Sequence, residues 1–290
     1  MYSVSAQVND VSLVKVPLTH APEFALDVST INDTLSSDPT IKLVYLSSPG
    51  NPTASLIPKS QVLQLLEHPT WNGVIVLDEA YIDFAPEGSS LAEWVTEWDN
   101  LVVMQTLSKA FGLAGIRLGA AFAAPPVARL LNNLKAPYNV GSLTSAIASQ
   151  ALSEEGLAVM RANCARILTQ KNRLLEELPK VKGIGRVRGG TASNFLLVEV
   201  LNREEKPDNA TALALYERLA GKRGVVVRFR GKEHGCLACL RITVGTEEEV
   251  TRFLTEAKKV LAEIYAESAR QVRDIEAEED REVRANEVIA

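Results

Sequence analysis

Short apolar runs that alternate with amphipathic stretches constrain this chain more than any other feature of its sequence. In the first half, runs of strand length are repeatedly followed by stretches whose apolar residues recur at helical spacing. The expected strands are 11–16, 42–47, 73–77, 101–105 and 117–123, and the expected helices between them are 60–67 and 91–98. Because parallel strands need a crossover connection, this alternation predicts an α/β protein with a largely parallel central sheet.

The pattern changes beyond residue 125. Helical patterns at 126–134, 142–152 and 154–178 are followed by strands at 194–200, 225–229 and 239–244, with helices at 210–220 and 247–265. The helix at 154–178 is long enough to join two lobes, so we expect a domain boundary near it. This predicts a large domain over 1–160, a smaller C-terminal α/β domain over 161–266 and a charged tail over 267–290.

The composition excludes several classes of protein. The 290 residues are 46% hydrophobic with a formal net charge of −5, too apolar and too weakly charged for a disordered chain. The mild acidic excess argues against a nucleic-acid partner, which calls for a basic face. No apolar run approaches the roughly 20 residues of a membrane helix. We therefore expect neither nucleic acid nor membrane among its partners.

The three cysteines indicate the redox environment. Cys164, Cys236 and Cys239 cannot all pair within one chain, and the C-x-x-C of the last two has no second pair to complete a zinc site. Residues 1–8 show neither the basic region nor the long apolar core of a signal peptide. We expect reduced thiols, no metal site and a cytoplasmic location.

Residues capable of chemistry follow three of the expected strands. In open α/β sheets, ligands bind beyond the carboxyl ends of the strands, so these residues are expected to share one crevice. They are Asn51 after 42–47, Asp78 and Tyr81 after 73–77, Ser108 and Lys109 after 101–105, and Arg117 eight residues further on.

This set of side chains suits one coenzyme. A partly desolvated lysine at the end of an apolar strand has a lowered pKa and is a good amine nucleophile for an aldehyde. Asp78 can pair with a protonated pyridine nitrogen, and Ser108 and Arg117 can bind a phosphate. Alone, Lys109 could be a surface lysine and Asp78 a helix cap. Together, the residues favour pyridoxal 5′-phosphate.

Three segments resemble the fold-type I pyridoxal-phosphate aminotransferases. They are SPGNPT at 48–53, LDEAY at 77–81 and TLSKAFGLAGIRLG at 106–119. Within that family the sequence is most similar to the histidinol-phosphate aminotransferases of the class II branch, over about residues 1–265. The resemblance implies a three-layer, mostly parallel sheet with a smaller C-terminal domain, and a homodimer. It also implies transfer of an amino group between L-histidinol phosphate and 2-oxoglutarate, giving imidazole-acetol phosphate and L-glutamate in L-histidine biosynthesis.

The same resemblance implies a role for each coenzyme residue. Lys109 forms the Schiff base with the coenzyme and then moves a proton as general acid and base. Asp78 keeps the pyridine nitrogen protonated, and Asn51 and Tyr81 hydrogen-bond the 3′ oxygen of the ring. The implied phosphate ligands are Ser108 and Arg117.

Three further residues are implied on the substrate side. Arg241 clamps the carboxylate of glutamate or 2-oxoglutarate, and Arg228 meets the phosphate of histidinol phosphate. Asn194 is a weaker candidate. Two guanidinium groups on neighbouring strands can serve both substrates, because guanidinium binds carboxylate and phosphate alike.

The sequence departs from the family pattern in two places. Ala54 stands where the family has glycine, a mild change if the backbone there does not need a positive φ. The start resembles a segment inside the family's large domain, so the large domain is expected to be incomplete, without its first strand, a phosphate-binding loop and the ring that stacks on the coenzyme. Tyr2 is not expected to replace that ring. The alternatives are an aminotransferase for aromatic amino acids, a phosphothreonine decarboxylase, or an incomplete, inactive relative.

Overall fold

The chain divides into two compact units, each with its own sheet and core. The computed structural model describes residues 2–21 and 23–289, with side chains described through residue 270. The first unit runs to Asn51 and continues from Ser55 to Gly156. The second unit comprises Pro52–Ala54 and the chain from Leu157 onward.

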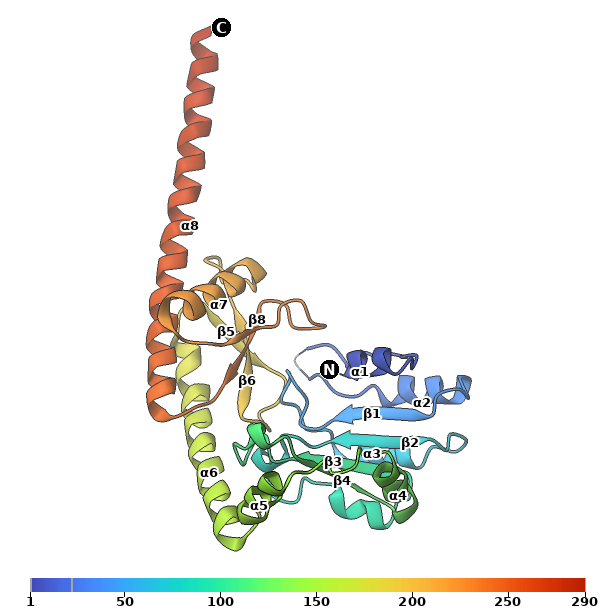
Figure 1. The fold of residues 1–290 in the computed structure, drawn as a ribbon. Helices are drawn as coiled ribbons and strands as arrows, with labels where there is room; N and C mark the ends of the chain where they lie inside the picture. Colours follow the sequence, from blue (N-terminus) through green and yellow to red (C-terminus); the bar gives the residue numbers. More distant parts are fainter. Residues whose placement is uncertain (1, 22, 290) are drawn as a thin grey trace. The chain divides into compact units, whose positions relative to one another are not determined.

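The sheet of the first unit has the strand order β1-β2-β3-β4. Strands β1, β2 and β3 are parallel, and β4 runs antiparallel to β3 (Figure 1). Ser47 lies opposite Asp78, which lies opposite Met104, so the carboxyl ends of the three parallel strands meet at one edge. The bounds are β1 Leu43–Ser47, β2 Val74–Asp78, β3 Leu101–Thr106 and β4 Gly119–Ala123, which confirms four of the predicted strands.

Two helices, α2 (Val28–Ser37) and α3 (Lys59–Leu66), build the core on one face of this sheet. Because side chains alternate along a strand, every second strand residue points into this core. The core residues are Leu46, Ile75, Leu77, Leu101 and Val103 from the strands, Ile31 and Leu35 from α2, and Val62, Leu65 and Leu66 from α3. By the same alternation, Tyr45, Asp78 and Met104 lie on the opposite face.

The structure corrects the sequence prediction near the N-terminus. The strand predicted at 11–16 is wrong: the segment is irregular, and Val11 and Val14 are exposed instead of paired in the sheet. Helices α1 (Tyr2–Val8) and α2 were not predicted. The sequence of α2, VSTINDTLSS, has low helix propensity, but Asp27 caps it by accepting a hydrogen bond from Thr30 N–H at 3.0 Å.

The remaining helical elements of the first unit are short. They are η1 (Ile82–Phe84), η2 (Ala92–Thr96), η3 (Ala114–Ile116), α4 (Pro125–Asn133) and α5 (Ser142–Ala151). The helix predicted at 91–98 is thus a shorter 3-10 helix, η2. Large apolar side chains of β4, α4, α5 and the chain between them are exposed, namely Phe122, Leu130, Leu131, Leu134, Tyr138, Leu143 and Ile147.

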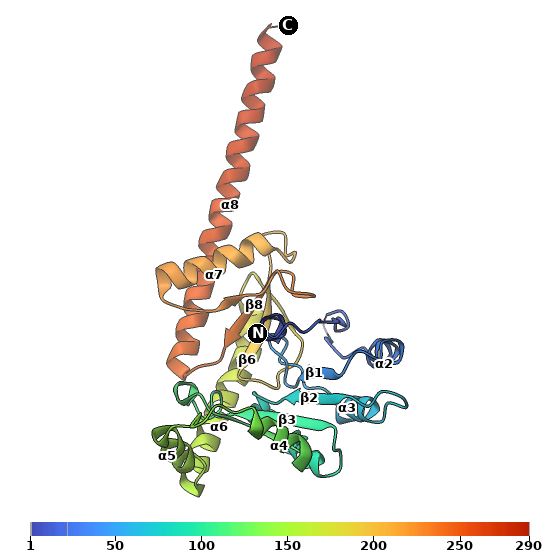
Figure 2. The ribbon, with the colours of Figure 1, turned by 45° about the vertical axis from the view of Figure 1, so that its right-hand side comes forward.

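The second unit has an antiparallel sheet covered on one face by helices. The strand order is β5-β6-β8-β7, and helices α7 and α8 lie against each other beside it (Figure 2). Its elements are α6 Glu154–Glu177, η4 Leu178–Lys180, β5 Ile184–Arg188, β6 Phe195–Val200, α7 Asn209–Arg223, β7 Arg228–Phe229, β8 Cys239–Thr243 and α8 Glu247–Ile289. Strand β5 was not predicted.

Helix α8 continues through most of the segment predicted as a charged tail, 267–290, as far as Ile289. Helix α8 is polar as well as long. Among the described residues, no helix combines the length and the apolar character needed to cross a membrane.

A buried carboxylate fixes the end of β2. Glu79 is only 1% exposed, and its Oε1 accepts a hydrogen bond from Leu91 N–H at 2.7 Å. Its Oε2 accepts from the Ser90 hydroxyl at 2.6 Å and from Gln105 Nε2 at 2.9 Å. A buried charge is tolerated when its oxygens are hydrogen-bonded in this way. Glu79 therefore ties β2 to β3 and to the loop before η2, directly beside Asp78.

We predict that Glu79→Ala lowers the free energy of unfolding of the first unit by about 3 kcal/mol, since three donors lose a charged acceptor. The measurement is urea denaturation followed by tryptophan fluorescence. It reports on this unit because Trp71, Trp94 and Trp98 are the only three tryptophans of the chain and all lie in it. The exposed Glu97→Ala is the matched control and should stay within about 0.5 kcal/mol of the wild type. Equal urea midpoints for Glu79→Ala and Glu97→Ala would contradict the stabilising role of Glu79.

All three cysteines are free and buried. Burial raises the pKa of Cys236 to about 11 and that of Cys239 to about 12, so both are neutral thiols near pH 7. Among the described residues, no group of three or more His, Cys, Asp or Glu side chains could hold a metal ion.

We predict that these thiols react slowly in the native protein. Because the thiolate is the reactive form, a rise in pKa from 9.0 to about 11 lowers the thiolate fraction of Cys236 about a hundredfold at pH 8. A disulfide reagent at pH 8 should therefore label the native protein slowly and all three cysteines rapidly in denaturant. Rapid labelling of Cys236 or Cys239 in the native protein would show that their burial is not maintained in solution.

Candidate active site

The predicted coenzyme residues all belong to the first unit, at or after the carboxyl ends of three adjacent strands. Asp78 is the last residue of β2, whereas Ser108 and Lys109 follow β3 after one intervening residue. Asn51 follows β1 in a turn that contains the cis peptide bond Ser48-Pro49 and is closed by a hydrogen bond from Gly50 N–H to Ser55 O at 2.9 Å. Parallel pairing thus brings these strand ends to the same edge of the sheet.

Both carboxylate oxygens of Asp78 have hydrogen-bond donors. Oδ1 accepts from Ala80 N–H at 2.9 Å, and Oδ2 accepts from the phenol of Tyr2 on α1. The Tyr2 ring lies 3.9 Å from the Tyr45 ring, measured between centroids. Burial and the neighbouring Asp78 raise the pKa of Tyr2, so its phenol stays protonated and donates. The sequence prediction gave Tyr2 no place at this site.

Lys109 lies beside Tyr81. Its Nζ is 5.2 Å from the centroid of the Tyr81 ring, within the range of a cation–π interaction. The Lys109 side chain is exposed, so the partial desolvation predicted for it is not found. An exposed amine can still reach an aldehyde, and Tyr81 holds it close to the end of β2.

The two predicted phosphate ligands are positioned by the loop after β3. The Thr106 hydroxyl donates to Ser108 Oγ at 2.8 Å and accepts from Ser108 N–H at 3.1 Å. Arg117 adopts a left-handed conformation, with φ 55, and its Nη1 donates to Ala114 O at 2.9 Å. A left-handed arginine is uncommon, and such backbone strain clusters at functional sites.

The donor set of this unit fits pyridoxal phosphate. The coenzyme needs an amine for its aldehyde, a carboxylate for its ring nitrogen, and hydroxyl and guanidinium donors for its phosphate. Lys109, Asp78, Ser108 and Arg117 are half-buried or exposed, and at Asp78 a ligand would meet an oxygen that already accepts from the Tyr2 phenol.

The predicted substrate residues lie in the second unit, on the face of its sheet opposite to the core. Arg188, Leu197, Arg241 and Arg228 form one row across β5, β6, β8 and β7. Arg228 and Arg241 are thus directly opposite each other on adjacent antiparallel strands. Because like charges in this arrangement destabilise a sheet, the pair indicates a place for an anion.

The three arginines of the row differ in their neighbours. Nη2 of Arg188 lies 3.3 Å from Oε1 of the buried Glu199, so this guanidinium has a counter-charge within the unit. The guanidinium carbon of Arg241 lies 5.0 Å from the centroid of the Phe195 ring, within the range of a cation–π interaction. Arg228 is exposed. Arg228 is therefore better placed than Arg188 to take an anionic ligand.

Asn194 ends an irregular segment, 189–194, that leads into β6. Its main-chain oxygen accepts from Val244 N–H at 2.8 Å, just after the end of β8. Two main-chain donors of the same segment bond the chain after Asn51: Gly190 N–H donates to Thr53 O at 2.9 Å and Ala192 N–H donates to Ala54 O at 3.0 Å.

Ala54 adopts a left-handed conformation, with φ 54. The replacement of glycine by alanine was expected to be mild only if the backbone here did not need a positive φ, and the structure shows that it does. An alanine in this region costs about 1–2 kcal/mol relative to the right-handed conformation.

The sequence prediction missed Lys171, which holds segment 189–194 from α6. The lysine is 5% exposed, and its Nζ donates to Thr191 O and, at 3.0 Å, to Ser193 O. A signal was present in the sequence. Lys171 falls at the same helical spacing as Leu174 and Leu178, so it occupies the apolar stripe of α6.

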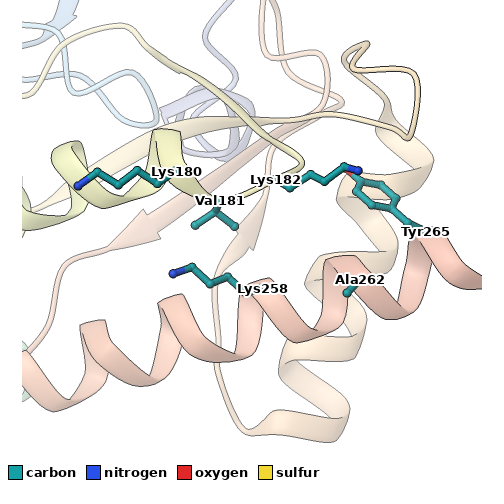
Figure 3. A pocket seen from close by; sticks show the side chains of 6 residues that line it. All are labelled: Lys180, Val181, Lys182, Lys258, Ala262 and Tyr265. Carbon is teal, nitrogen blue, oxygen red and sulfur yellow. The ribbon is translucent and has the colours of Figure 1, made fainter.

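A surface pocket of the second unit lies apart from these residues. It has a volume of about 190 Å³ and lies between the end of η4 and α8 (Figure 3). Val181, Ala262 and Tyr265 line it, and the ammonium groups of Lys180, Lys182 and Lys258 do not converge on one point. None of the predicted site residues lines this pocket.

Known proteins resemble this chain over most of its length. The model of the family "Aminotransferase class I and II" matches residues 1–256. Histidinol-phosphate aminotransferase of Schizosaccharomyces pombe is 49% identical over 267 residues, which are 91% of this chain and 69% of that protein. The enzyme of the same name from Saccharomyces cerevisiae is 45% identical over 92% of this chain and 68% of that protein.

A solved structure agrees in fold. The histidinol-phosphate aminotransferase of Sinorhizobium meliloti, in complex with pyridoxal-5′-phosphate, superposes with a TM-score of 0.79 at 23% identity, over 91% of this chain and 68% of that one. The match of the family model to most of the sequence, together with these identities, establishes that the chain belongs to the class I and II aminotransferases.

Proposed function

We propose that this chain is a pyridoxal-phosphate-dependent transaminase that converts L-histidinol phosphate and 2-oxoglutarate to imidazole-acetol phosphate and L-glutamate, in L-histidine biosynthesis. The observation that carries the proposal is the set Asn51, Asp78 and Lys109, which lie at or just after the carboxyl ends of three adjacent parallel strands. It occurs in a chain that is 49% identical to a histidinol-phosphate aminotransferase.

The bound coenzyme would supply an electron sink for the carbanion that forms at the substrate's α-carbon. The Asp78 carboxylate would hold a positive charge at the ring nitrogen, and Ser108 and Arg117 would anchor the phosphate. The Lys109 amine would bind the aldehyde carbon and later carry a proton to and from the reacting atoms. Asn51 and Tyr81 would donate to the 3′ oxygen of the ring.

The arginine pair of the second unit supports the choice of substrate. Arg228 and Arg241 directly oppose each other, so an anion between them relieves their repulsion. Histidinol phosphate offers a phosphate and glutamate offers two carboxylates, and guanidinium binds both groups. We assign Arg228 to the phosphate, Arg241 to the carboxylate and Asn194 to the substrate side.

We also propose the organisation that accompanies this activity. Residues 1–160 form the coenzyme-binding domain, 161–266 the small domain and 267–290 a charged extension. The exposed apolar side chains of β4, α4 and α5 support a homodimer, since apolar patches of this kind mark protein interfaces. The three free thiols support a reducing, cytoplasmic location.

The first test is coenzyme binding and turnover. The purified chain incubated with pyridoxal phosphate should develop a visible absorbance band and form glutamate from histidinol phosphate and 2-oxoglutarate. We predict that Lys109→Ala abolishes the absorbance band and glutamate formation, because it removes the amine that we propose binds the coenzyme aldehyde. The matched variant Lys135→Ala should retain both. A wild-type chain that neither binds the coenzyme nor turns over would instead support the alternative of an inactive relative.

The second test addresses the substrate. We predict that Arg228→Ala raises KM for histidinol phosphate about tenfold to hundredfold, the loss expected for a charge-assisted hydrogen bond. KM for 2-oxoglutarate should change less, because Arg241 remains. Steady-state kinetics with each substrate varied would measure both values, with the exposed Arg203→Ala as the control. An unchanged half-reaction of Arg228→Ala with histidinol phosphate would overturn the assignment.

A further inference from the structure

Lys171 is a buried ammonium group with no acidic partner in the described part of the chain. It lies on α6 in a stripe of buried residues that includes Cys164 and Leu174, and it is 5% exposed. None of the ion pairs found among the described residues includes it. Burial lowers its pKa, and no nearby carboxylate counteracts that effect. Lys171 therefore interacts with its surroundings mainly through the two carbonyl groups that it bonds.

Packing alone does not account for a lysine at this position. Removing an ammonium group from water costs several kcal/mol, and an unbranched apolar side chain would fill a similar volume without that cost. The two acceptors, Thr191 O and Ser193 O, belong to an irregular segment whose carbonyls have no partner strand. A flexible stem that carries three donors can satisfy both carbonyls at once.

The segment that Lys171 holds is joined to chain that carries predicted site residues. Through Gly190 and Ala192 it bonds the main chain of Thr53 and Ala54, two and three residues after Asn51. Through Asn194 O it bonds Val244 N–H, three residues after Arg241. Ser193 itself is fully buried. One ammonium group therefore anchors the meeting point of three segments.

We propose that Lys171 is a positioning residue of the active site. Its ammonium fixes segment 190–194 and, through the main-chain bonds of that segment, the chain that follows Asn51 and the backbone of Asn194. The proposal rests on the proposed function for the roles of Asn51 and Asn194. The anchoring itself can be tested without them.

The anchoring is tested by hydrogen exchange on Lys171→Met, which removes the donors and keeps the length of the side chain. The amides of Gly190 and Ala192 donate the bonds to Thr53 and Ala54, so in the coenzyme-free protein they should exchange at least tenfold faster than in the wild type. Lys180→Met, the same substitution at an exposed lysine three residues beyond α6, should leave them unchanged. Wild-type exchange at these amides in Lys171→Met would overturn the proposal, whether or not the chain is active.

The functional consequence is tested in the holoenzyme. The thermal midpoint of Lys171→Met should stay within a few degrees of the wild-type value. Its affinity for pyridoxal phosphate, measured by quenching of tryptophan fluorescence, should fall about tenfold. KM for histidinol phosphate should rise by a similar factor. Lys171→Arg, which keeps donors in place, should recover most of both losses. Equal losses in the two variants, accompanied by a lowered thermal midpoint, would assign Lys171 a purely structural role and overturn the proposal.

A failure of the proposed function has a different signature. If the wild-type chain itself neither binds pyridoxal phosphate nor forms glutamate, the proposed function fails. Hydrogen exchange then still decides whether Lys171 anchors the segment.

Discussion

The parallel hydrogen bonding of β1, β2 and β3 is the constraint on which the candidate coenzyme site depends. A parallel ladder places the carboxyl ends of neighbouring strands at the same edge, so residues 31 and 26 positions apart in the sequence become neighbours across the sheet. The apolar alternation that buries one face of these strands also sets their register, since a slip by one residue would turn Asp78 into the core. Core packing and site geometry are thus specified by the same side chains.

Buried charged groups fix the loops next to the predicted site residues. Glu79 holds the loop before η2 and the neighbouring strand beside Asp78, and Lys171 holds the segment before β6. Most groups that hydrogen-bond the Glu79 and Lys171 side chains are main-chain groups or lie in irregular segments, not in regular strands. Irregular segments lack ladder hydrogen bonds, so a charged side chain with several bonds is an effective way to fix their conformation.

The sequence predicted those site residues that directly follow a recognisable strand. The strands around Asp78 and Lys109 were predicted because continuous apolar runs mark buried parallel strands, and the site residues directly follow them. Helix α2 was missed because the burial of Ile31 and Leu35 overrides its low helix propensity. The partners of Lys171 and the contact between Tyr2 and Asp78 join residues far apart in the sequence, which no local pattern encodes. Ala54, whose backbone is left-handed, likewise bonds the distant segment 189–194.

The bond between the Tyr2 phenol and Asp78 changes what an affinity measured for a coenzyme would mean. Oδ2 of Asp78 already has a neutral donor within the chain, while Oδ1 is held by Ala80. Because a carboxylate oxygen can accept more than one hydrogen bond, a ring nitrogen at Oδ2 would either share this oxygen with the phenol or compete with it. Where the two donors compete, the apparent dissociation constant would report the difference between two hydrogen bonds, and the association rate would include the departure of the Tyr2 phenol from Asp78.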